Sequence, residues 1–415
     1  MNMNKKIITV VLAVIVLVSG IIAAVAVRKS LYSSNADVPV IIETAVPGDI
    51  GSNGDNTVAQ NVYSEVTSNP VNITTSGTGN INDSFKIVAV GDILLGRGVG
   101  SRLKDSNRNF KYPFLEVADI LKKGDVVFAN LEEPITARTR SLKGIKEGGK
   151  YVLKNDPEAI EGLSFAGFNL FSLANNHILD YYEEGLFDTM SVLDKFGIAY
   201  SGAGKNIEEA LKPAIIEKRG VKTGLLSYTD MSEVVYKGNP PLMFIAGKDK
   251  PGVAKRPINF DDSIKSDIES LRDNVDILIV SLHWGVEDSF EVLPRQRDYA
   301  HQLIDAGVDV VLGHHPHQFQ GIEVYKGKPI FYSLGNFIFD QNDPENQESF
   351  IISMDFEDFE LAKIEAIPVR TISKVQVVPQ YGTNAKDLLE RELKLCSELD
   401  TKFRIENDAL IFDID

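Results

Sequence analysis

DVVLGHHPH, residues 309–317, joins a short apolar run to three histidines within four positions. A continuous, β-branched apolar run of this length is typical of a strand that is buried on both faces of a sheet. Five further segments have the same form, in which an apolar run leads into a polar cluster. They are FKIVAVGD (85–92), DVVFANLE (125–132), NLFSLANNH (169–177), KTGLLSYTD (222–230) and DILIVSLHWG (276–285).

The segments between these strands have helical character. They comprise residues 157–166, 183–196, 261–273 and 294–306. An alternation of strand and helix predicts an α/β domain with mainly parallel pairing. After the histidine loop the strands become closely spaced, and we expect them to pair antiparallel as a second sheet packed on the first. These strands are IEVY (322–325), PIFYSLGNF (329–337), SFIISMDFE (349–357) and LAKIEAIPV (361–369). A helix near 384–399, opened by Asn384, is expected to cover one face.

Composition limits the kinds of site and partner. The 415 residues are 43% hydrophobic and 25% charged, which is typical of a globular protein. Cys396 is the single cysteine, so the chain has neither an internal disulfide nor a thiolate zinc site, and any metal must be held by His, Asn, Asp or Glu. The net charge of −16 argues against a nucleic-acid partner, because little basic surface is available to displace phosphate counterions.

The N-terminus predicts an attachment to a membrane. Basic pairs at 5–6 and 28–29 flank residues 7–27, which carry no charge. As a helix this run spans about 30 Å, enough to cross a bilayer core. A cleaved secretory signal is the alternative, because residues 24–26 (AVA) are small as a cleavage site requires. The length of the run favours an uncleaved anchor.

Residues 30–84 contain no Lys or Arg and are rich in Ser, Asn, Thr and Gly. Such a segment buries too little apolar surface to offset the entropy of ordering, so we expect a disordered tether. The predicted organisation is therefore a membrane anchor or signal (1–29), a linker (30–84) and one folded domain (85–415). We expect a single-pass protein of the cell membrane with its domain on the extracytoplasmic side, or a secreted protein if the signal is cleaved.

The ends of five predicted strands carry side chains suited to metal binding or acid–base chemistry. They are Asp92; Asn130 and Glu132; Asn176 and His177; His283; and His314, His315 and His317. Ligands collect beyond the carboxyl ends of strands in α/β sheets, so we expect these side chains to meet at one edge of the sheet. A single histidine after a strand is ordinarily a structural residue, but five of the six histidines lie at these ends. The sixth, His301, lies within a predicted helix and is interpreted as structural.

The histidine loop itself predicts a metal site. In an extended or tightly turned loop, alternate residues project to one side, so His315 and His317 should point together while His314 points away. Pro316 restricts the backbone between them. Imidazoles together with Asn and carboxylate oxygens suit Zn, Mn, Fe or Mg. We therefore expect one or two divalent metal ions, whose identity the sequence does not distinguish.

Six motifs, in this order, resemble the signature blocks of the CapA family of capsule or poly-γ-glutamate biosynthesis proteins, which is related to the calcineurin-like metallophosphoesterases. They are GDILLGRG, NLEEPIT, LANNHILDYYEEG, HWGVE, GHHPHQFQ and YSLGNFIFD, and the similarity covers residues 85–345. The resemblance implies a four-layer α/β/β/α sandwich of two packed mixed sheets, to which residues 346–415 add strands and a helix. It also implies residence on the outer side of a bacterial membrane.

The resemblance also implies roles for the metal-site residues. It assigns Asp92 and His317 to one metal ion. Asn176, His283 and His315 are assigned to a second ion, and Glu132 is a candidate for the bridging carboxylate.

The resemblance further implies that His177 is the general acid at the leaving group, with Asp180 orienting it; the alternative for Asp180 is a turn or helix-start role. Four residues are candidates for substrate contact. They are Asn130, Arg97, Glu287 and Asn336. A solvated surface role is the alternative for Arg97 and Glu287, and a turn role is the alternative for Asn336.

One position departs from the phosphoesterase pattern, which begins Asp-x-His. Here Leu94 stands in place of that histidine. CapA proteins resemble one another in this loss, which puts a full two-metal mechanism in doubt and leaves a mononuclear Lewis acid as an alternative.

We interpret the protein as an enzyme, a metal-dependent hydrolase or transferase acting on an anionic surface polymer or its precursor. A non-catalytic anchored subunit of a polymer synthesis and export assembly, with polyglutamate synthase subunits as partners, is the first alternative. A plain metallophosphoesterase is the second.

Overall fold

The structure, a computed structural model, describes residues 84–146, 151–234 and 241–414. These residues belong to one compact unit, Gly77–Asp415. The predicted anchor (1–29) and all of the predicted linker except its last residue lie outside the described residues. Within the described ranges, no helix combines the length and the apolar character needed to span a membrane.

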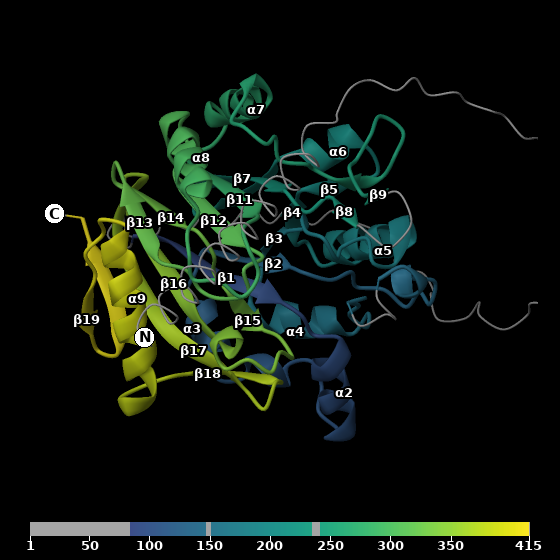
Figure 1. The fold of residues 1–415 in the computed structure, drawn as a ribbon, viewed down its shortest axis with the longest axis horizontal. Coiled ribbons are helices and arrows are strands. Elements are labelled where there is room, and N and C mark those ends of the chain that lie inside the picture. Colours follow the sequence, from purple (N-terminus) through teal and green to yellow (C-terminus); the bar gives the residue numbers. More distant parts are fainter. Residues whose placement is uncertain (1–83, 147–150, 235–240, 415) are drawn as a thin grey trace, which may run out of the picture. The chain divides into compact units, whose positions relative to one another are not determined.

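One sheet has ten strands (Figure 1). Its parallel part consists of β1 (Phe85–Ile93), β2 (Val126–Leu131), β3 (Leu170–Ser172) and β4 (Ala199–Ser201). On the other side of β1 the sheet continues antiparallel through β16 (Glu348–Glu357), β17 (Glu360–Ile372), β20 (Ala409–Asp413) and β19 (Arg404–Glu406). Two short strands complete it, β15 (Asn336–Ile338) beside β1 and β18 (Gln376–Pro379) beside β17.

A second sheet has six strands. In spatial order these are β13 (Ile322–Tyr325), β14 (Lys328–Phe331), β12 (Val310–His314), β11 (Ile277–His283), β7 (Val221–Thr229) and β6 (Ala214–Lys218). The four central strands are parallel and the two outer ones antiparallel. Four short strands form two separate two-stranded sheets. These are β5 (Ala203–Gly204) with β10 (Gly252–Val253), and β8 (Glu233–Val234) with β9 (Leu242–Met243).

Helices connect the strands. The α-helices are α2 (Arg97–Asp105), α3 (Ala118–Leu121), α4 (Ala159–Ala166), α5 (Tyr182–Lys195), α6 (Ile207–Leu211), α7 (Asp262–Arg272), α8 (Pro294–Asp305) and α9 (Thr383–Glu398). Short 3₁₀ turns are η1 (Tyr112–Phe114), η2 (Leu142–Gly144) and η4 (Glu345–Gln347). The helices predicted over 157–166, 183–196, 261–273 and 294–306 correspond to α4, α5, α7 and α8. At α7 the Asp261 carboxylate accepts the backbone N–H groups of Ser263 and Ile264, which fixes the start of the helix.

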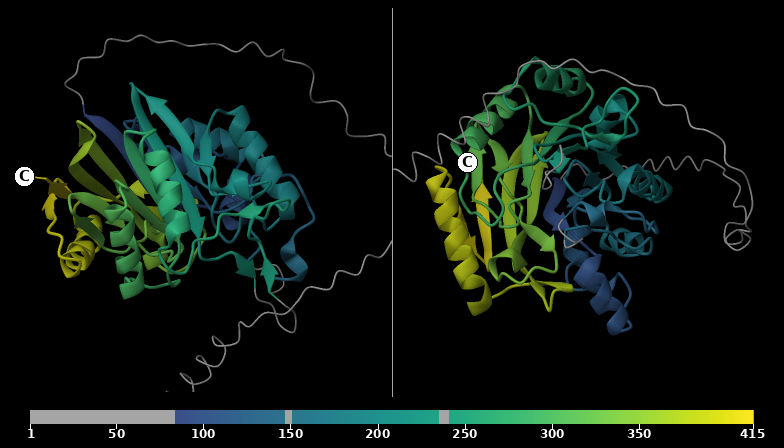
Figure 2. Two further views of the ribbon diagram at one scale, coloured as in Figure 1. Left: turned by 90° about the horizontal axis from the view of Figure 1, so that it is seen from above. Right: turned by 45° about the vertical axis from the view of Figure 1, so that its right-hand side comes forward.

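Three buried apolar clusters lie between the layers of the fold and show their order. In β1, Val88 and Val90 pack with α2, α3, α4 and α5, whereas Ile87 and Ala89 face the six-stranded sheet. On the far side of the six-stranded sheet, residues such as Val280 of β11 pack with α7 and α8. The sequence of layers is therefore helices, ten-stranded sheet, six-stranded sheet, helices (Figures 1 and 2). The prediction of a mixed α/β domain with more than one sheet is confirmed.

Helix α9 closes one side of the core between the two sheets. Its residues Ala385, Leu388 and Leu389 belong to the same apolar cluster as the facing strands, and it contacts β13, β17, β19 and β20 (Figure 1). The helix starts at Thr383 after Gly382, which has φ 56°, rather than being opened by Asn384. Burial raises the pKa of Glu392 on this helix to about 8, although the charge of Arg391 acts in the opposite direction.

The sequence predicted that the closely spaced strands after the histidine loop form a second sheet of their own, but the structure divides these strands between the two sheets. β13 and β14 join the middle strands β7, β11 and β12 in the six-stranded sheet, whereas β16 and β17 extend the first sheet antiparallel from β1. The segment 329–337 is two strands, β14 in the six-stranded sheet and β15 in the ten-stranded sheet. The chain crosses between them at Gly335 (φ 62°). A Cβ at Gly91 of β1 would lie 1.9 Å from the Gly335 carbonyl oxygen, so this crossing requires glycine at position 91.

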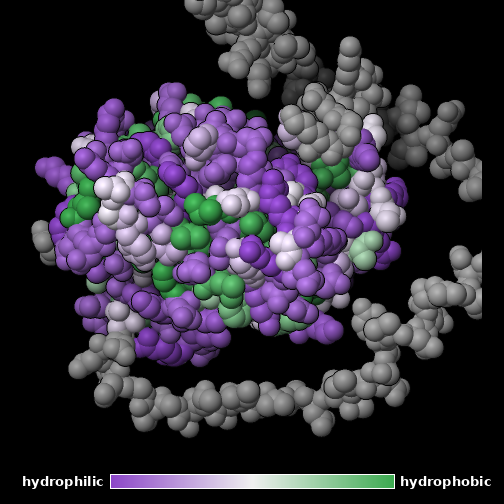
Figure 3. Space-filling view, turned by 90° about the horizontal axis from the view of Figure 1, so that it is seen from below, coloured by the Kyte–Doolittle hydropathy of each residue, from purple (hydrophilic) through white to green (hydrophobic). Residues whose placement is uncertain are grey.

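The surface seen in Figure 3 is mainly hydrophilic. Hydrophobic residues form small, separate groups on this face. Isolated exposed apolar residues are normal for a water-exposed domain and need no partner to cover them.

Candidate metal centre

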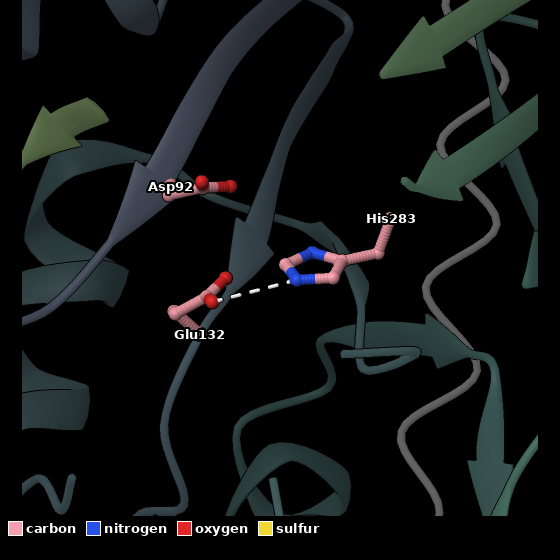
Figure 4. A group of neighbouring side chains, drawn as sticks. All are labelled: Asp92, Glu132 and His283. Carbon is pink, nitrogen blue, oxygen red and sulfur yellow. Dashed lines mark ion pairs between the residues drawn. The ribbon is translucent and has the colours of Figure 1, made fainter. Parts of the chain in front are cut away.

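Two carboxylates and one imidazole converge at the carboxyl ends of three strands. Asp92 is the second-last residue of β1, Glu132 directly follows β2 and His283 ends β11. One potential ligand atom from each lies within 4.8 Å of the others, and all three side chains are buried (Figure 4). His283 Nε2 is 3.6 Å from Glu132 Oε1. The convergence was predicted at the edge of a single sheet, but it joins two, because the ten-stranded and six-stranded sheets pack with these strand ends facing each other.

Asn130 orients both carboxylates. Its Nδ2 donates to Asp92 Oδ1 at 2.9 Å and also to Glu132 Oε2, while its Oδ1 accepts from Asn175 Nδ2 at 3.1 Å. The side chain is fully buried and both amide atoms are engaged. The prediction that Asn130 contacts substrate is therefore replaced by a positioning role.

Asn175 shapes the LANNH turn. Its Nδ2 donates to the Leu131 carbonyl at 2.8 Å, and its Oδ1 accepts the backbone N–H groups of His177 and Ile178 at 3.1 and 2.9 Å. Sequence reasoning passed over this first asparagine of the motif. Its signal was an Asn at a strand end, where such side chains commonly satisfy turn backbone.

The two buried carboxylates differ in proton affinity. Burial raises the pKa of Glu132 well above its usual value, and the charge of Asp92 adds to this effect. Burial alone would also raise the pKa of Asp92, but hydrogen bonding to His314 and the nearby charges of His314 and His317 lower it overall. Two such groups side by side cannot both ionise cheaply without a cation, so the pair is suited to hold one.

His283 presents a neutral imidazole. Its Nε2 lies 3.0 Å from Asn176 Oδ1, and its Nδ1 has no hydrogen-bond partner among the described residues. Burial lowers the pKa of His283 well below its usual value, and the neighbouring histidine His315 adds to this. Neutral imidazole is the form that ligates a metal ion.

His315 and His317 enter the same site, although the loop that carries them is not extended. Both residues are left-handed, with φ of 96° and 61°. The His315 ring lies 4.9 Å from that of His283 and 6.1 Å from that of His317, measured between centroids. His317 Nδ1 is 3.8 Å from Asp92 Oδ2. Left-handed backbone costs about 1–3 kcal/mol per residue and persists where the surroundings enforce it, commonly at functional sites.

His314 does not point away from the site. Its Nδ1 lies 3.0 Å from Asp92 Oδ1, and its Nε2 is buried without a hydrogen-bond partner among the described residues. The reason is that β12 continues through His314. Val310 and Leu312 face the ten-stranded sheet, and His314, two residues further along, lies on the same face of the strand. The expectation for His314 was therefore wrong.

Asn336 positions His317. Residues Asp92 and Asn336 are register partners between β1 and β15. Asn336 Oδ1 lies 2.9 Å from His317 Nδ1, and its Nδ2 donates to the Asn346 carbonyl at 3.1 Å. Its side chain is buried and both amide atoms are engaged, so a role in orienting His317 replaces the predicted substrate contact.

His177 forms a pair with Asp180 and contacts a lysine that sequence reasoning missed. His177 Nδ1 is 2.8 Å from Asp180 Oδ2, as the orienting role of Asp180 requires. Lys146 forms an ion pair with Asp180 Oδ1 and lies 3.3 Å from His177 Nδ1. Burial and then the charge of Lys146 lower the pKa of His177 to about 4, against the opposing effect of Asp180. The ring is therefore neutral near pH 7, and its role as the general acid stays a prediction.

A comparison with known proteins places the chain. The profile described as "Bacterial capsule synthesis protein PGA_cap" matches residues 86–341. The chain belongs to this family. It is 32% identical over 336 residues to "PGA biosynthesis protein CapA" of Bacillus subtilis, covering 80% of this chain and 83% of that protein. It is 31% identical over 294 residues to "Capsule biosynthesis protein CapA" of Bacillus anthracis, covering 69% and 68%.

Other known proteins are less similar to the chain. A "Probable polyglutamine synthesis accessory protein" of Mycobacterium tuberculosis is 29% identical over 306 residues, which cover 65% of this chain and 78% of that protein. Among solved structures, a hypothetical protein of Thermus thermophilus has a TM-score of 0.39 at 16% identity, covering 68% of this chain and 98% of that one. A 5'-nucleotidase of Candida albicans has a TM-score of 0.34 at 12% identity, covering 66% and 48%. Neither structural likeness is close enough to support an inference about this chain.

Two predicted contact residues of this PGA_cap protein lie at the periphery. Arg97 forms an ion pair with Asp340 and lies 5.6 Å over the Phe339 ring. Glu287 has a side chain that is 59% exposed, and its Oε1 lies 4.0 Å from His315 Nε2. Glu287 is therefore at the rim of the site, whereas Arg97 is fixed to Asp340.

The donor set fits a divalent ion. Oxygen ligands from carboxylates and an amide, with neutral imidazole nitrogens, suit such ions. Leu94 is fully buried in the apolar cluster on the helix side of the sheet, so that position supplies no ligand. Four buried atoms around the site have no hydrogen-bond partner among the described residues. They are Glu132 Oε1, His283 Nδ1, His314 Nε2 and His315 Nδ1.

Proposed function

We propose that this PGA_cap protein is a metal-dependent hydrolase or transferase acting on an anionic surface polymer, or its precursor, outside the cytoplasm. The observation that carries the proposal is the clustering of ligand atoms of Asp92, Glu132 and His283 within 4.8 Å in the buried interior. Burying two carboxylates together is costly unless a cation compensates them. The His177–Asp180 pair beside this cluster favours chemistry over a purely structural metal.

The residues that would hold the ion are Asp92, Glu132, Asn176 and His283, with His315 and His317 next to them. A divalent ion, when bound, supplies a Lewis acid that stabilises negative charge developing on a phosphoryl or acyl group.

Proton transfer is assigned to His177. Asp180 engages Nδ1, so Nε2 is the ring atom that exchanges a proton with the substrate. The neutral ring first takes a proton from the attacking water or hydroxyl group. The charged ring then returns that proton to the leaving group, which is the step for which a general acid was predicted. Attack by water gives hydrolysis, and attack by a hydroxyl or amine gives transfer.

The substrate and location rest on other observations. Relatives named for capsule and PGA biosynthesis support a surface polymer such as poly-γ-glutamate or its precursor. The uncharged run at 7–27 and the polar segment 30–84 support a membrane anchor with an extracytoplasmic domain. Polyglutamate synthase subunits are the proposed partners, and the mycobacterial relative named as an accessory protein supports such an association.

A second function is favoured by one observation. Leu94 leaves the site without the histidine of the phosphoesterase pattern, which fits a non-catalytic subunit that binds polymer through a retained metal. The same observation counts against a plain metallophosphoesterase.

The test compares turnover with binding. Purified full chain in detergent, loaded with Mn²⁺ or Zn²⁺, is incubated with γ-linked oligoglutamate, and products are analysed by mass spectrometry. The enzyme proposal predicts shortened or transferred chains, and a large loss of turnover in His177→Asn with metal content unchanged. His301→Asn, outside the site, is the control. Binding without turnover identifies the accessory subunit, and turnover of p-nitrophenyl phosphate alone identifies a phosphoesterase.

A further inference from the structure

A buried lysine stands beside the proposed proton-transfer pair. The Lys146 side chain is 8% exposed and its partner Asp180 is fully buried. The nearby Lys143, three residues earlier, is exposed. Burying an ammonium group is costly, so a lysine in this place requires compensating contacts.

We propose that Lys146 is a positioning residue that fixes the Asn176–His177 segment for metal binding and proton transfer. The proposal rests on the proposed function of this site. No motif or comparison assigned Lys146 a role.

The contacts of Lys146 hold that segment from its backbone. Its Nζ donates to the Asn176 carbonyl at 3.1 Å and forms an ion pair with Asp180 Oδ1. The Asn176 side chain meanwhile meets His283 Nε2 at 3.0 Å. Lys146 therefore holds the peptide group between Asn176 and His177 in place. Asn176 is a candidate metal ligand, and His177 is the proposed proton carrier.

Lys146 also acts on the pairing of His177 with Asp180. His177 Nδ1 is 2.8 Å from Asp180 Oδ2 and 3.3 Å from Lys146 Nζ. Lys146 and Asp180 compete for His177 Nδ1, because an ammonium group only donates and a carboxylate only accepts. Lys146 already donates to the Asn176 carbonyl and to Asp180, so Nδ1 can carry a proton and donate it to Asp180. We assign the Nδ1–H tautomer on this geometry, with Nε2 unprotonated.

The neighbouring backbone fixes Lys146 in turn. The Lys146 N–H donates to the Leu142 carbonyl at 2.9 Å, and the Leu142 N–H donates to the Asp180 carbonyl at 2.9 Å. Asp180 Oδ2 also accepts the Leu153 N–H at 2.7 Å. Asp180 thus ties Lys146, His177 and two backbone positions together.

A direct role in binding a substrate anion is the competing explanation. Such a lysine would keep donors free and exposed toward the cleft. Lys146 is instead buried, with its donors directed at Asn176 and Asp180. The contacts therefore favour positioning.

The experiment compares Lys146→Met with Lys143→Met in the full chain. Titration calorimetry measures Mn²⁺ binding without substrate, and ¹⁵N-histidine NMR reads the ring nitrogens of the six histidines, with His177→Asn assigning its signals. We expect Lys146→Met to weaken Mn²⁺ binding by about 10-fold or more, as loss of an outer-shell contact does. The His177 ring signals should shift, because the segment that carries the ring loses the donor to its Asn176 carbonyl. Lys143→Met should match the parent protein in both readouts.

Lys146→Met leaves the buried Asp180 carboxylate without its ion-pair partner, which could prevent folding. The second test is therefore the double variant Lys146→Met/Asp180→Asn. It removes both charges and should fold, with the same weakened Mn²⁺ binding. Mn²⁺ affinity and His177 signals unchanged in Lys146→Met would overturn the proposal. A parent protein that binds no Mn²⁺ would instead refute the proposed function, and the His177 signals would still decide whether Lys146 positions that ring.

Discussion

Acid should destabilise the metal-free protein through His315. Burial, followed by the charge of His317, lowers the pKa of His315 from 6.5 to about 3, although Asp92 acts in the opposite direction. In the unfolded chain His315 takes up a proton as the pH falls through about 6.5, whereas in the folded protein it does so only near 3. Between these values the unfolded state binds more protons, so the free energy of unfolding falls as the pH falls.

The magnitude follows from the two pKa values. At pH 5, linkage gives a loss of about 2 kcal/mol from His315 alone, rising toward about 5 kcal/mol once both states are protonated. His315→Asn removes the titrating group. Its stability relative to the parent protein should therefore improve by about 2 kcal/mol between about pH 7.5 and pH 5, whatever its constant packing cost.

Urea unfolding in EDTA at these two pH values measures the change. Gln318→Asn is the matched control, because Gln318 is a buried residue of the same loop that does not titrate. Its difference from the parent protein should be the same at both pH values. A difference between His315→Asn and the parent protein that does not vary with pH would refute the burial of a neutral His315.

Three further predictions concern single side chains. Burial raises the pKa of Glu392 to about 8, so ionisation of this residue opposes folding as the pH rises from about 4.5 to above 8. Over this range the free energy of unfolding of Glu392→Gln, measured in urea, should rise relative to the parent protein by up to about 4 kcal/mol. Leu94→His should lower the free energy of unfolding by about 1–3 kcal/mol without raising metal content in elemental analysis, because it places a polar ring in an apolar cluster; a gain of metal would contradict this. Asp180→Asn should cost about 3–5 kcal/mol in urea unfolding by leaving Lys146 unpaired, whereas Asp188→Asn, which breaks a largely exposed pair, should cost under about 1 kcal/mol; equal costs would contradict the burial argument.

Much of the fold was predictable because buried strands have a local signature. The apolar runs predicted β1, β2, β7, β11 and β12 to within about a residue or two at each end. The sheet to which a strand belongs is set by non-local pairing, which periodicity does not encode. This is why β16 and β17 were placed in the wrong sheet, and why one predicted segment proved to be β14 and β15.

In the candidate site, too, some residues could be predicted from the sequence and others could not. Asp92, Glu132 and His283 were predictable from their places at strand ends, where side chains converge. The direction of His314 depended on whether β12 continued through it, and one residue reverses the face to which a side chain points. Lys146 had no signal at all, since it lies in a loop rich in charged residues and its partner Asp180 is 34 positions away.

Metal content tests the central claim most directly. Full chain purified in detergent, equilibrated with Mn²⁺ or Zn²⁺ and freed of excess ion, is measured by elemental analysis alongside Asp92→Asn, His283→Ala and the control His301→Ala. We predict at least one ion per chain in the parent protein and in His301→Ala, and a loss in both site variants. A parent protein without metal, or site variants that retain it in full, would contradict the account.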